Sequence, residues 1–426
     1  MNRSIAVWMV CVLLVVLQVG CTVSPGGRGG GEDESAAAAR LGDAWFRDVL
    51  DGSAAMWGGL LRDPTGHRVQ ILVSEVIEDP EGPPTLRRYR YRVDAEYVYP
   101  ASTIKLAGCV AALIELQRLQ AESGLALTAD TPLVLYPRRE DGMVRVRDDS
   151  NVDNGTITLR QEIRKTCFVS SNEAYNRLYD FVGRDRLNQI LWEAGLESFR
   201  LHHRLSDPGD EAYHRFTPQV DMVLDQRAYS VGPRTAVVSL PLAGVRGGLL
   251  LGERHVNEAG ALVEEPFDFS DKNWVSMEDL QDLVVMVTRP EIELGKPGLG
   301  LSGQHRTLML SAMSQDPLES SNPVYSSSRY APGSFDSYVV DGIAKVVPRP
   351  AVVAFDKSGT AYGYRLDTGY YLDRSTGASF YLTVAVYNNP NGTINDDTYG
   401  YEAANRFHET LGERVARKLW RAAERQ

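Results

Sequence analysis

Apolar residues along this chain follow two different spacings, and the spacing depends on the position in the chain. Near both ends of the chain, residues 68–77, 364–372 and 380–387 have strand character, residues 86–99 alternate aromatic with basic positions, and a short apolar run at 352–355 leads into a lysine. A period of two is typical of β-strands with one face exposed to solvent. Strands are therefore predicted near both ends of the chain.

Between these ends the apolar residues recur every three or four positions. This spacing predicts helices over 36–50, 102–121, 158–180, 186–195, 276–288 and 304–313, with a last amphipathic helix over 401–425. The two strand-rich ends must pair with each other. We predict an α+β fold, in which an antiparallel sheet from both chain ends is flanked by helices and an all-helical lobe lies beside it.

Two stretches break the helical pattern. Residues from about 222 to 274 contain short apolar runs between glycines and prolines, so we expect an inserted segment that is β-rich or irregular. Residues 320–337 are rich in serine, which favours a loop.

The first residues form a targeting segment. Residues 1–20 begin with a positive charge and continue as an apolar run that is short for a bilayer span, which is typical of a signal peptide. Gly20-Cys21 resembles a bacterial lipobox, which implies lipidation of Cys21. Gln18 departs from that pattern, and the alternative is an ordinary secretory signal with an unrelated cysteine. We expect a flexible tether at 21–40 and the folded domain at 41–426, in the periplasm or cell envelope and lipid-anchored, or otherwise secreted.

Charge and length limit the partners. The chain has 426 residues and a formal net charge of −11, which argues against a nucleic-acid partner. No later apolar run is long enough for a bilayer, so a lipid anchor is the predicted contact with a membrane.

Cysteine and histidine spacings do not predict a metal site. Cys109 and Cys167 follow the signal region, and the sequence leaves two alternatives open, a disulfide or two buried free thiols. We expect His202, His203 and His214 to lie on a loop surface. We predict neither a metal nor another cofactor.

Candidate chemistry lies in three short motifs, the first of which is Ser102-x-x-Lys105. Ser102 follows a proline at the start of a predicted helix, and Lys105 projects from the same helix face. A serine hydroxyl needs a base before it can attack a carbonyl group. A lysine can act as that base only if burial or a neighbouring cation lowers its pKa.

The second and third motifs supply groups that a substrate would need. Ser170 can relay a proton to a leaving nitrogen, and the Asn172 amide can hold a substrate carbonyl group. In the third motif, Lys357 and the hydroxyls of Ser358 and Thr360 can bind a substrate carboxylate. The backbone N–H groups of Thr360 and of the nucleophile can together form an oxyanion hole.

Together these segments resemble the class A β-lactamase-like serine hydrolases, within the wider penicillin-recognising group. The segments that carry the resemblance are 99–105, 170–176 and 356–360. The resemblance implies Ser102 as nucleophile, Lys105 as base, Ser170 as proton relay, Asn172 as substrate contact and Lys357 as carboxylate site. Arg365, on the following strand, is a weaker candidate for a second carboxylate partner.

One part of the family pattern is missing. Class A β-lactamases carry an E-x-x-L-N motif whose glutamate activates the water for deacylation, and residues 200–211 contain no such motif. Asp207 and Glu211 are the carboxylates available there, and neither aligns well.

Three functions remain open at this stage. The first is an enzyme that opens the β-lactam ring through an acyl-enzyme on Ser102. The second is a D-alanyl peptidase or an esterase with the same mechanism, acting on a peptidoglycan-like substrate. The third is a non-catalytic envelope-binding protein.

Overall fold

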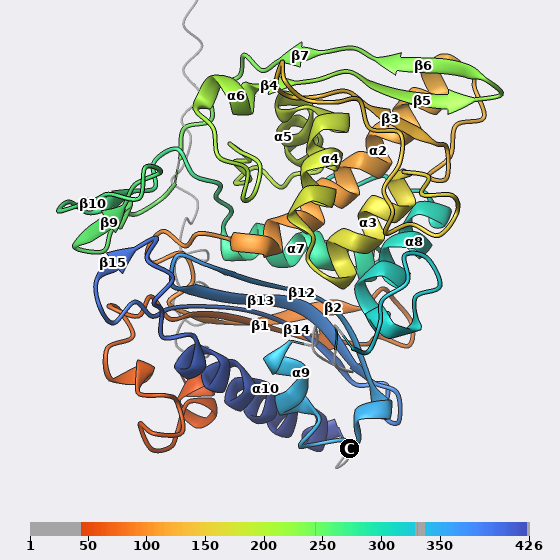
Figure 1. The fold of residues 1–426 in the computed structure, drawn as a ribbon. Helices are drawn as coiled ribbons and strands as arrows, with labels where there is room; N and C mark the ends of the chain where they lie inside the picture. Colours follow the sequence, from red (N-terminus) through yellow and green to blue (C-terminus); the bar gives the residue numbers. More distant parts are fainter. Residues whose placement is uncertain (1–43, 243, 329, 331–336, 424–426) are drawn as a thin grey trace, which may run out of the picture.

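A five-stranded antiparallel sheet forms the centre of the molecule (Figure 1). The computed structural model describes residues 44–242, 244–328, 330 and 337–423. The strand order is β12-β13-β14-β1-β2. The bounds are β1 Gln70–Ile77, β2 Thr85–Tyr91, β12 Val352–Ala361, β13 Tyr364–Asp373 and β14 Ser379–Tyr387. Strands from both chain ends thus meet in one sheet, and the predicted α+β fold is confirmed.

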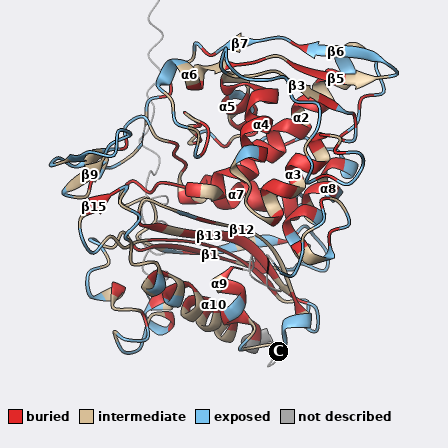
Figure 2. Ribbon diagram, in the orientation of Figure 1, coloured by how far each residue is buried: buried red, intermediate tan, exposed pale blue. Residues whose placement is uncertain are grey.

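Helices cover both faces of this sheet, which explains why its inner strands are buried on both sides (Figure 2). β1 lies between β14 and β2, and Val73 faces Leu382 on one side and Tyr89 on the other. One face is covered by α9 (Tyr338–Ile343) and α10 (Tyr401–Ala423). The apolar stripe of α10, predicted from its spacing, packs on Tyr371 and Phe380 in one hydrophobic cluster.

The helical lobe lies against the other face of the sheet. Its helices are α2 (Lys105–Ser123), α3 (Leu159–Phe168), α4 (Asn172–Val182), α5 (Arg184–Glu193), α7 (Met277–Thr288) and α8 (Gly303–Ser314). α2 runs through the middle of the lobe, and most of its residues are buried. The start of α2 therefore lies where the lobe meets the sheet.

Short strands surround the lobe. They are β3 (Leu133–Leu135), β4 (Phe216–Thr217), β5 (Val220–Leu224), β6 (Arg227–Val231), β7 (Arg234–Thr235), β8 (Leu250–Leu251), β9 (Arg254–Val256), β10 (Leu262–Val263), β11 (Phe267–Asp268) and β15 (Thr393–Ile394), with a short helix α6 (Glu211–Arg215) before β4. Several of them lie within 222–274, which the sequence predicted to be β-rich or irregular. β9 pairs with β15 from the C-terminal part of the chain.

Two predicted elements had the wrong extent. The strand expected over 86–99 ends at Tyr91, because Arg92 and Asp94 take positive φ angles of 51° and 55° in the turn that follows. The single helix expected over 158–180 is two helices, α3 and α4. The break falls at Ser170, whose φ of 52° is incompatible with a continuing right-handed helix.

The predicted signal peptide at 1–20, the tether at 21–40 and the lipidated Cys21 lie outside the described residues. None of the described helices has both the length and the apolar character that a membrane crossing requires.

Candidate active site

The predicted nucleophile lies in a 3₁₀ turn at the junction of the sheet and the lobe. This turn spans Ala101–Ile104 and leads directly into α2. Ser102 is half-buried, and Ala101 before it has a φ of 47°, a conformation that costs energy for a residue with a side chain. The turn thus holds Ser102 at the open end of α2, where the first backbone N–H groups lack partners within the helix.

Lys105 is fully buried and contacts the second motif. Its Nζ donates to the backbone oxygen of Ser170 (2.5 Å) and to Ser170 Oγ (3.1 Å). Burial and, to a smaller extent, the neighbouring Lys357 cation together lower the pKa of Lys105 to about 6. Most Lys105 side chains are therefore uncharged at neutral pH, as a general base requires.

The break between α3 and α4 presents the second motif to Lys105. Ser171 caps α4, because its side chain accepts a hydrogen bond from the Ala174 N–H. Ser170, in its strained conformation, lies just before this cap. Asn172 begins α4, and its Nδ2 donates to Ser206 Oγ (2.8 Å).

The third motif lies on edge strand β12, which packs on the nucleophile turn. A Cβ atom at Gly359 would lie 2.7 Å from the Ser102 backbone nitrogen, so glycine is needed for this approach. Lys357 is buried, its Nζ donates to the Ser358 backbone oxygen (2.8 Å), and burial lowers its pKa.

The remaining predicted residues lie next to this strand. Thr360 is exposed, and its Oγ1 accepts a hydrogen bond from Arg365 Nη1 (2.8 Å). Arg365 also lies over the ring of Tyr338 at 4.9 Å. Ser358 is half-buried, and strand alternation directs its side chain to the face opposite that of Lys357.

A cavity of about 560 Å³ opens beside the nucleophile. Ser102, Asn172 and Thr360 from the three motifs are among its lining residues. The loop 202–211 forms a second side of the cavity, and residues of β9 and the turn after it form a third. The structure thus brings one residue of each motif to a common space, next to the Lys105–Ser170 contact.

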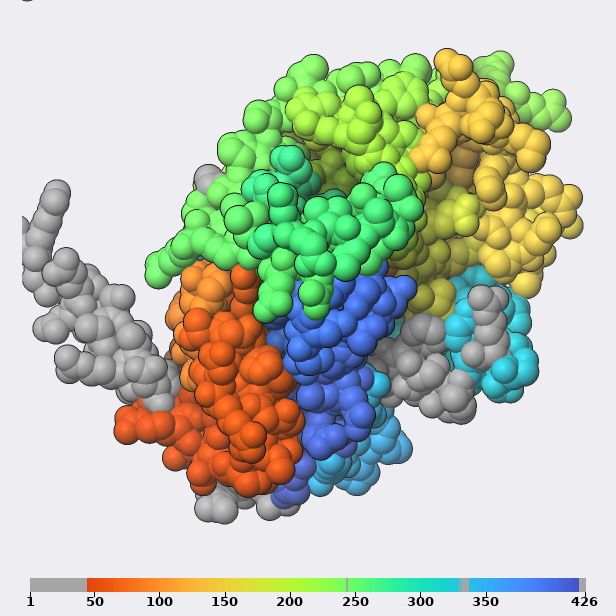
Figure 3. Space-filling model, turned by 60° about the vertical axis from the view of Figure 1, so that its left-hand side comes forward, coloured from red at the N-terminus to blue at the C-terminus, as the bar shows by residue number. Residues whose placement is uncertain are grey.

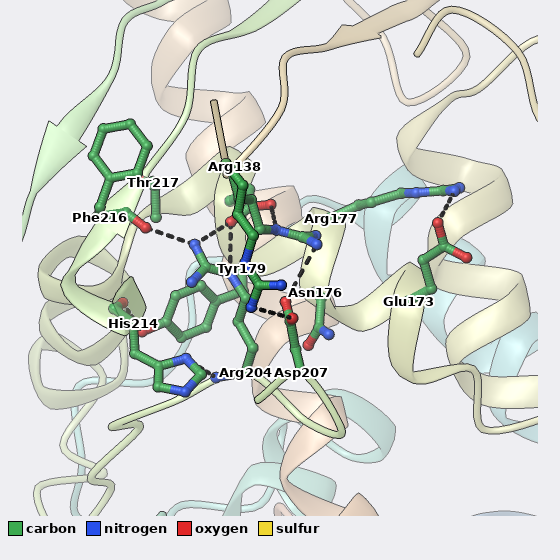
Figure 4. Close-up of polar contacts among 12 residues, drawn as sticks. Arg138, Glu173, Asn176, Arg177, Tyr179, Arg204, Asp207, His214, Phe216 and Thr217 are labelled. Carbon is green, nitrogen blue, oxygen red and sulfur yellow. Dashed lines mark hydrogen bonds and ion pairs between the residues drawn. The ribbon is translucent and has the colours of Figure 1, made fainter. Parts of the chain in front are cut away.

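The loop at 204–207, which lines the cavity, is held by polar contacts (Figure 4). Arg204 donates to Asp180 Oδ1 through Nε (2.9 Å) and Nη2 (2.5 Å). Asp207 Oδ2 accepts from Arg138 Nη1 (3.3 Å) and from the Tyr213 hydroxyl (2.9 Å). The Asp207 carboxylate therefore stabilises the loop and is not free to activate water.

Leu205 and Ser206 are the loop residues that face the predicted substrate contacts. Asn176 holds the Leu205 backbone in both directions, donating to its oxygen and accepting from its N–H, each at 2.9 Å. Leu205 and Ser206 both line the cavity with Ser102. Glu211, the other candidate base, is bound by Arg215 Nη2 (2.6 Å). Sequence reasoning missed Ser206 and Asn176, because only the fold brings the loop to α4.

The histidines were expected on a loop surface, and that expectation was wrong. His202 and His214 are each 8% exposed and His203 is half-buried, and all three line the cavity. Burial lowers the pKa values of His202 and His214 to about 4, so both rings are neutral at pH 7. Among the described residues, no group of histidine, cysteine and carboxylate side chains is arranged to hold a metal ion.

Cys109 and Cys167 are free thiols, which decides between the two alternatives left by the sequence. Burial raises the pKa of the Cys109 thiol well above its ordinary value. The disulfide alternative was therefore wrong, and Cys109 is an inert part of the lobe's core.

A comparison of the sequence with known protein families supports the resemblance that the motifs indicate. Residues 85–237 match a family described as "Beta-lactamase enzyme family", a range that includes the first two motifs. The predicted resemblance to the β-lactamase family is thereby confirmed over these residues. No significant match is found among curated proteins.

Several solved structures are similar to this chain. A β-lactamase from Sphaerobacter thermophilus DSM 20745 is 14% identical, covering 86% of this chain and 97% of its own, with a TM-score of 0.45. A β-lactamase from Desulfarculus baarsii DSM 2075 is 15% identical, with coverages of 86% and 96% and a TM-score of 0.47. A mutant of PBP-A, in an acyl-enzyme complex with penicillin G, is 16% identical, with coverages of 87% and 96% and a TM-score of 0.45.

Proposed function

We propose that this protein is a serine acyl hydrolase that opens the β-lactam ring and forms an acyl-enzyme on Ser102. The observation that carries the proposal is the buried Lys105, whose pKa of about 6 leaves an uncharged amine three residues after the nucleophile. A neutral amine at this place can take the Ser102 hydroxyl proton as Oγ attacks the carbonyl carbon.

The other residues of the three motifs act in the later steps of the reaction. The negative charge that develops on the carbonyl oxygen is stabilised by the backbone N–H groups of Ser102 and Thr360. When the carbon–nitrogen bond of the ring breaks, Ser170 delivers a proton to the nitrogen, and Lys105 replenishes it through their 3.1 Å contact. Lys357 holds the substrate carboxylate, with Arg365 as a second cation nearby. Asn172 holds the carbonyl group of the substrate's side-chain amide.

Deacylation is the slow step in this account. A water molecule that attacks the ester on Ser102 needs a base, and the carboxylates of Asp207 and Glu211 are bound by arginines. We therefore expect the penicilloyl adduct to persist. The same observation favours a second candidate function, a D-alanyl peptidase or esterase whose own acyl group leaves Ser102 more readily.

Intact-protein mass spectrometry after adding penicillin G tests the proposal. The protein lacking residues 1–21 should gain one penicillin mass, and the Ser102→Ala variant should gain none. An adduct that forms and clears within seconds would support a β-lactamase with efficient turnover. A lasting adduct is the expected result, and hydrolysis of a D-alanyl peptide or an ester by the same protein would then support the second candidate. No adduct on the folded wild-type protein would contradict both and support a non-catalytic envelope-binding protein.

A further inference from the structure

Two buried lysines lie at the site, and the proposed reaction needs them in opposite charge states. Lys105 must be neutral to take the Ser102 proton, whereas Lys357 must be a cation to hold the substrate carboxylate. Their side chains are 0% and 5% exposed, and burial lowers the pKa of both amines. A further interaction must therefore distinguish the two lysines.

Two carboxyl groups lie on the face of the sheet opposite to that of Lys357. Strand alternation directs Asp356 and Lys357 to opposite faces of β12. Asp356 is paired with Gly369 of β13, and Asp367 lies two residues before Gly369 on the same face. Tyr371, the next residue on that face, packs in the hydrophobic cluster with α10. Asp356 and Asp367 are thus diagonal neighbours beneath α9 and α10.

The missing side chain at Gly369 brings the two carboxyl groups together. A Cβ atom at Gly369 would lie 2.6 Å from Asp356 Cβ and 2.7 Å from the Tyr371 hydroxyl. Asp356 therefore lies over Gly369, between the side chains on either side of it. Burial and the charge of Asp356 raise the pKa of Asp367, which is 0% exposed, to about 8. The pair thus holds one proton and one negative charge at pH 7.

Helices close this face of the sheet. In Figure 3 the blue C-terminal part of the chain packs directly against the orange N-terminal part. Ser337, the N-cap of α9, is 1% exposed and lies next to Asp367. Burial keeps the His408 ring of α10 and the Tyr371 hydroxyl uncharged, because it lowers the pKa of the histidine and raises that of the tyrosine. Among the described residues, Arg365 is the charged group that remains beside the pair on this face.

Arg365 does not cancel the effect of the pair on Lys357. Its Nη1 donates to Thr360 Oγ1, three residues beyond Lys357 along β12. Asp356, by contrast, is the immediate neighbour of Lys357 in the chain. Burial lowers the pKa of Lys357, whereas Asp356 and Asp367 each raise it by more than the Arg365 cation lowers it. The pair therefore favours the protonated form of Lys357.

The surroundings of Lys105 differ in this respect. Besides burial, the groups that act on its pKa within the described part of the chain are Lys357 and the thiols of Cys109 and Cys167. Cys167 raises the pKa of both lysines, so it does not distinguish them. The carboxyl pair acts on Lys357, and the Lys357 cation in turn lowers the pKa of Lys105.

We propose that Asp356 and Asp367 assign the charges of the two active-site lysines. One negative charge, shared by the two carboxyl groups, keeps Lys357 protonated, and the Lys357 cation keeps Lys105 neutral. Both aspartates act through Lys357 and are positioning residues. This inference rests on the proposed function for the roles of the lysines, and it names what regulates the same site as pH changes.

The pH dependence of penicillin affinity tests the inference. The double variant Asp356→Asn/Asp367→Asn removes the charge, and Asp367→Asn is the matched control that keeps a carboxylate at Asp356. The rate of adduct formation against penicillin G concentration separates the half-saturating concentration from the maximal rate. As pH rises, the half-saturating concentration should start to increase about one pH unit earlier in the double variant, and by much less than that in the control.

At pH 6 the three proteins should have equal half-saturating concentrations, because Lys357 is protonated in each. A purely structural role of the pair would instead weaken binding at every pH. Weakening that is the same at pH 6 and pH 9, or a folded double variant with the wild-type profile, would overturn the inference.

Lysine titration by NMR tests the charges without any activity. The protein is labelled with [ε-¹³C]lysine, and Lys105→Met and Lys357→Met assign the two signals. In the wild type Lys105 should titrate near pH 6 and Lys357 at a higher pH. In the double variant the midpoint of Lys357 should fall and that of Lys105 should rise, because a neutral Lys357 no longer repels the Lys105 ammonium. A wild type in which Lys357 loses its proton first would overturn the inference, whether or not the double variant folds.

The two measurements separate this inference from the proposed function. If Ser102 is labelled by penicillin but neither lysine titration responds to the double variant, the charge assignment is wrong and the proposed function stands. If the titrations respond as expected but no adduct forms, the charge assignment is right and the proposed function is wrong.

Discussion

At the scale of single residues, the site depends on what surrounds each polar group. Lys105 is fully buried and close to a second buried lysine, and both conditions lower its pKa. Asp207 is one of the two carboxylates that the sequence offers as a base, yet Arg138 and Tyr213 bind its carboxylate. The contacts of each titratable side chain therefore decide whether it can act as a base.

The apolar residue at 205 gives a prediction about adduct lifetime. Leu205 lines the cavity with Ser102, and its backbone is held by Asn176. Leu205→Glu introduces a carboxylate at this position, and we expect deacylation to accelerate by about 100-fold, a typical general-base contribution. The measurement is the decay of the penicilloyl adduct by intact mass. Leu205→Gln is the control of equal size without a base. Equal lifetimes in the two variants would show that the lack of a carboxylate at 205 does not limit deacylation.

At the scale of secondary-structure elements, the site forms where strand β12 crosses the turn before α2. The two elements touch through Gly359, and this contact sets how far the third motif lies from Ser102. The break between α3 and α4 positions the second motif in a similar way, because it turns Ser170 toward Lys105. The second motif is therefore positioned by a break between two helices, and the third by a close contact between a strand and a turn.

The Gly359 contact predicts the effect of one methyl group. Gly359→Ala puts a Cβ 2.7 Å from the Ser102 nitrogen and 2.9 Å from the Thr103 nitrogen, both of which are backbone atoms. We expect a loss of about 1–3 kcal/mol in the free energy of unfolding, as for other overpacked sites, together with slower acylation. Gly303→Ala, at a glycine with open space around it, should leave both unchanged. Denaturant unfolding and adduct formation are the measurements. A Gly359→Ala protein that matches the wild type in both would contradict the proposed contact.

Local patterns account for the parts of the site that sequence reasoning found. The spacing of Ser102 and Lys105 places them on one helix face, and the strand-like composition of 364–372 and 380–387 reflects the sheet. The positive φ of Ser170 leaves no signal in a helical pattern, so the break was missed. The burial of His202 and the pairing of β9 with β15 depend on contacts between distant segments, which composition and periodicity do not record.

At the scale of the whole molecule, the sheet joins the two chain ends and thereby assembles the site. Lys357 is far along the chain from Ser102, yet β12 brings it close enough to lower the pKa of Lys105. The middle of the chain contributes the helical lobe. The motifs become one site only when both ends of the chain have folded into the same sheet.

The N-terminal segment gives a prediction about location. If Cys21 is lipidated, the full-length protein expressed in a bacterium should sediment with membranes, and Cys21→Ser should move it to the soluble or secreted fraction. Cys11→Ser, within the apolar stretch, is the control and should not change the distribution. Fractionation with immunoblotting measures this, and equal distributions of wild type and Cys21→Ser would show that Cys21 is not the anchor.

The pH dependence of acylation tests the central claim most directly, namely that neutral Lys105 activates Ser102. The pKa of Lys105 is lowered to about 6, so the amine is protonated below that pH and free above it. The rate of penicillin adduct formation, followed by quenched-flow mass spectrometry, should rise about tenfold between pH 5 and 7 and then level off. Lys105→Met should be slower by about 100-fold or more and should lose this profile. A wild-type rate that does not change from pH 5 to 8, or a folded Lys105→Met protein that acylates as fast as the wild type, would contradict the account.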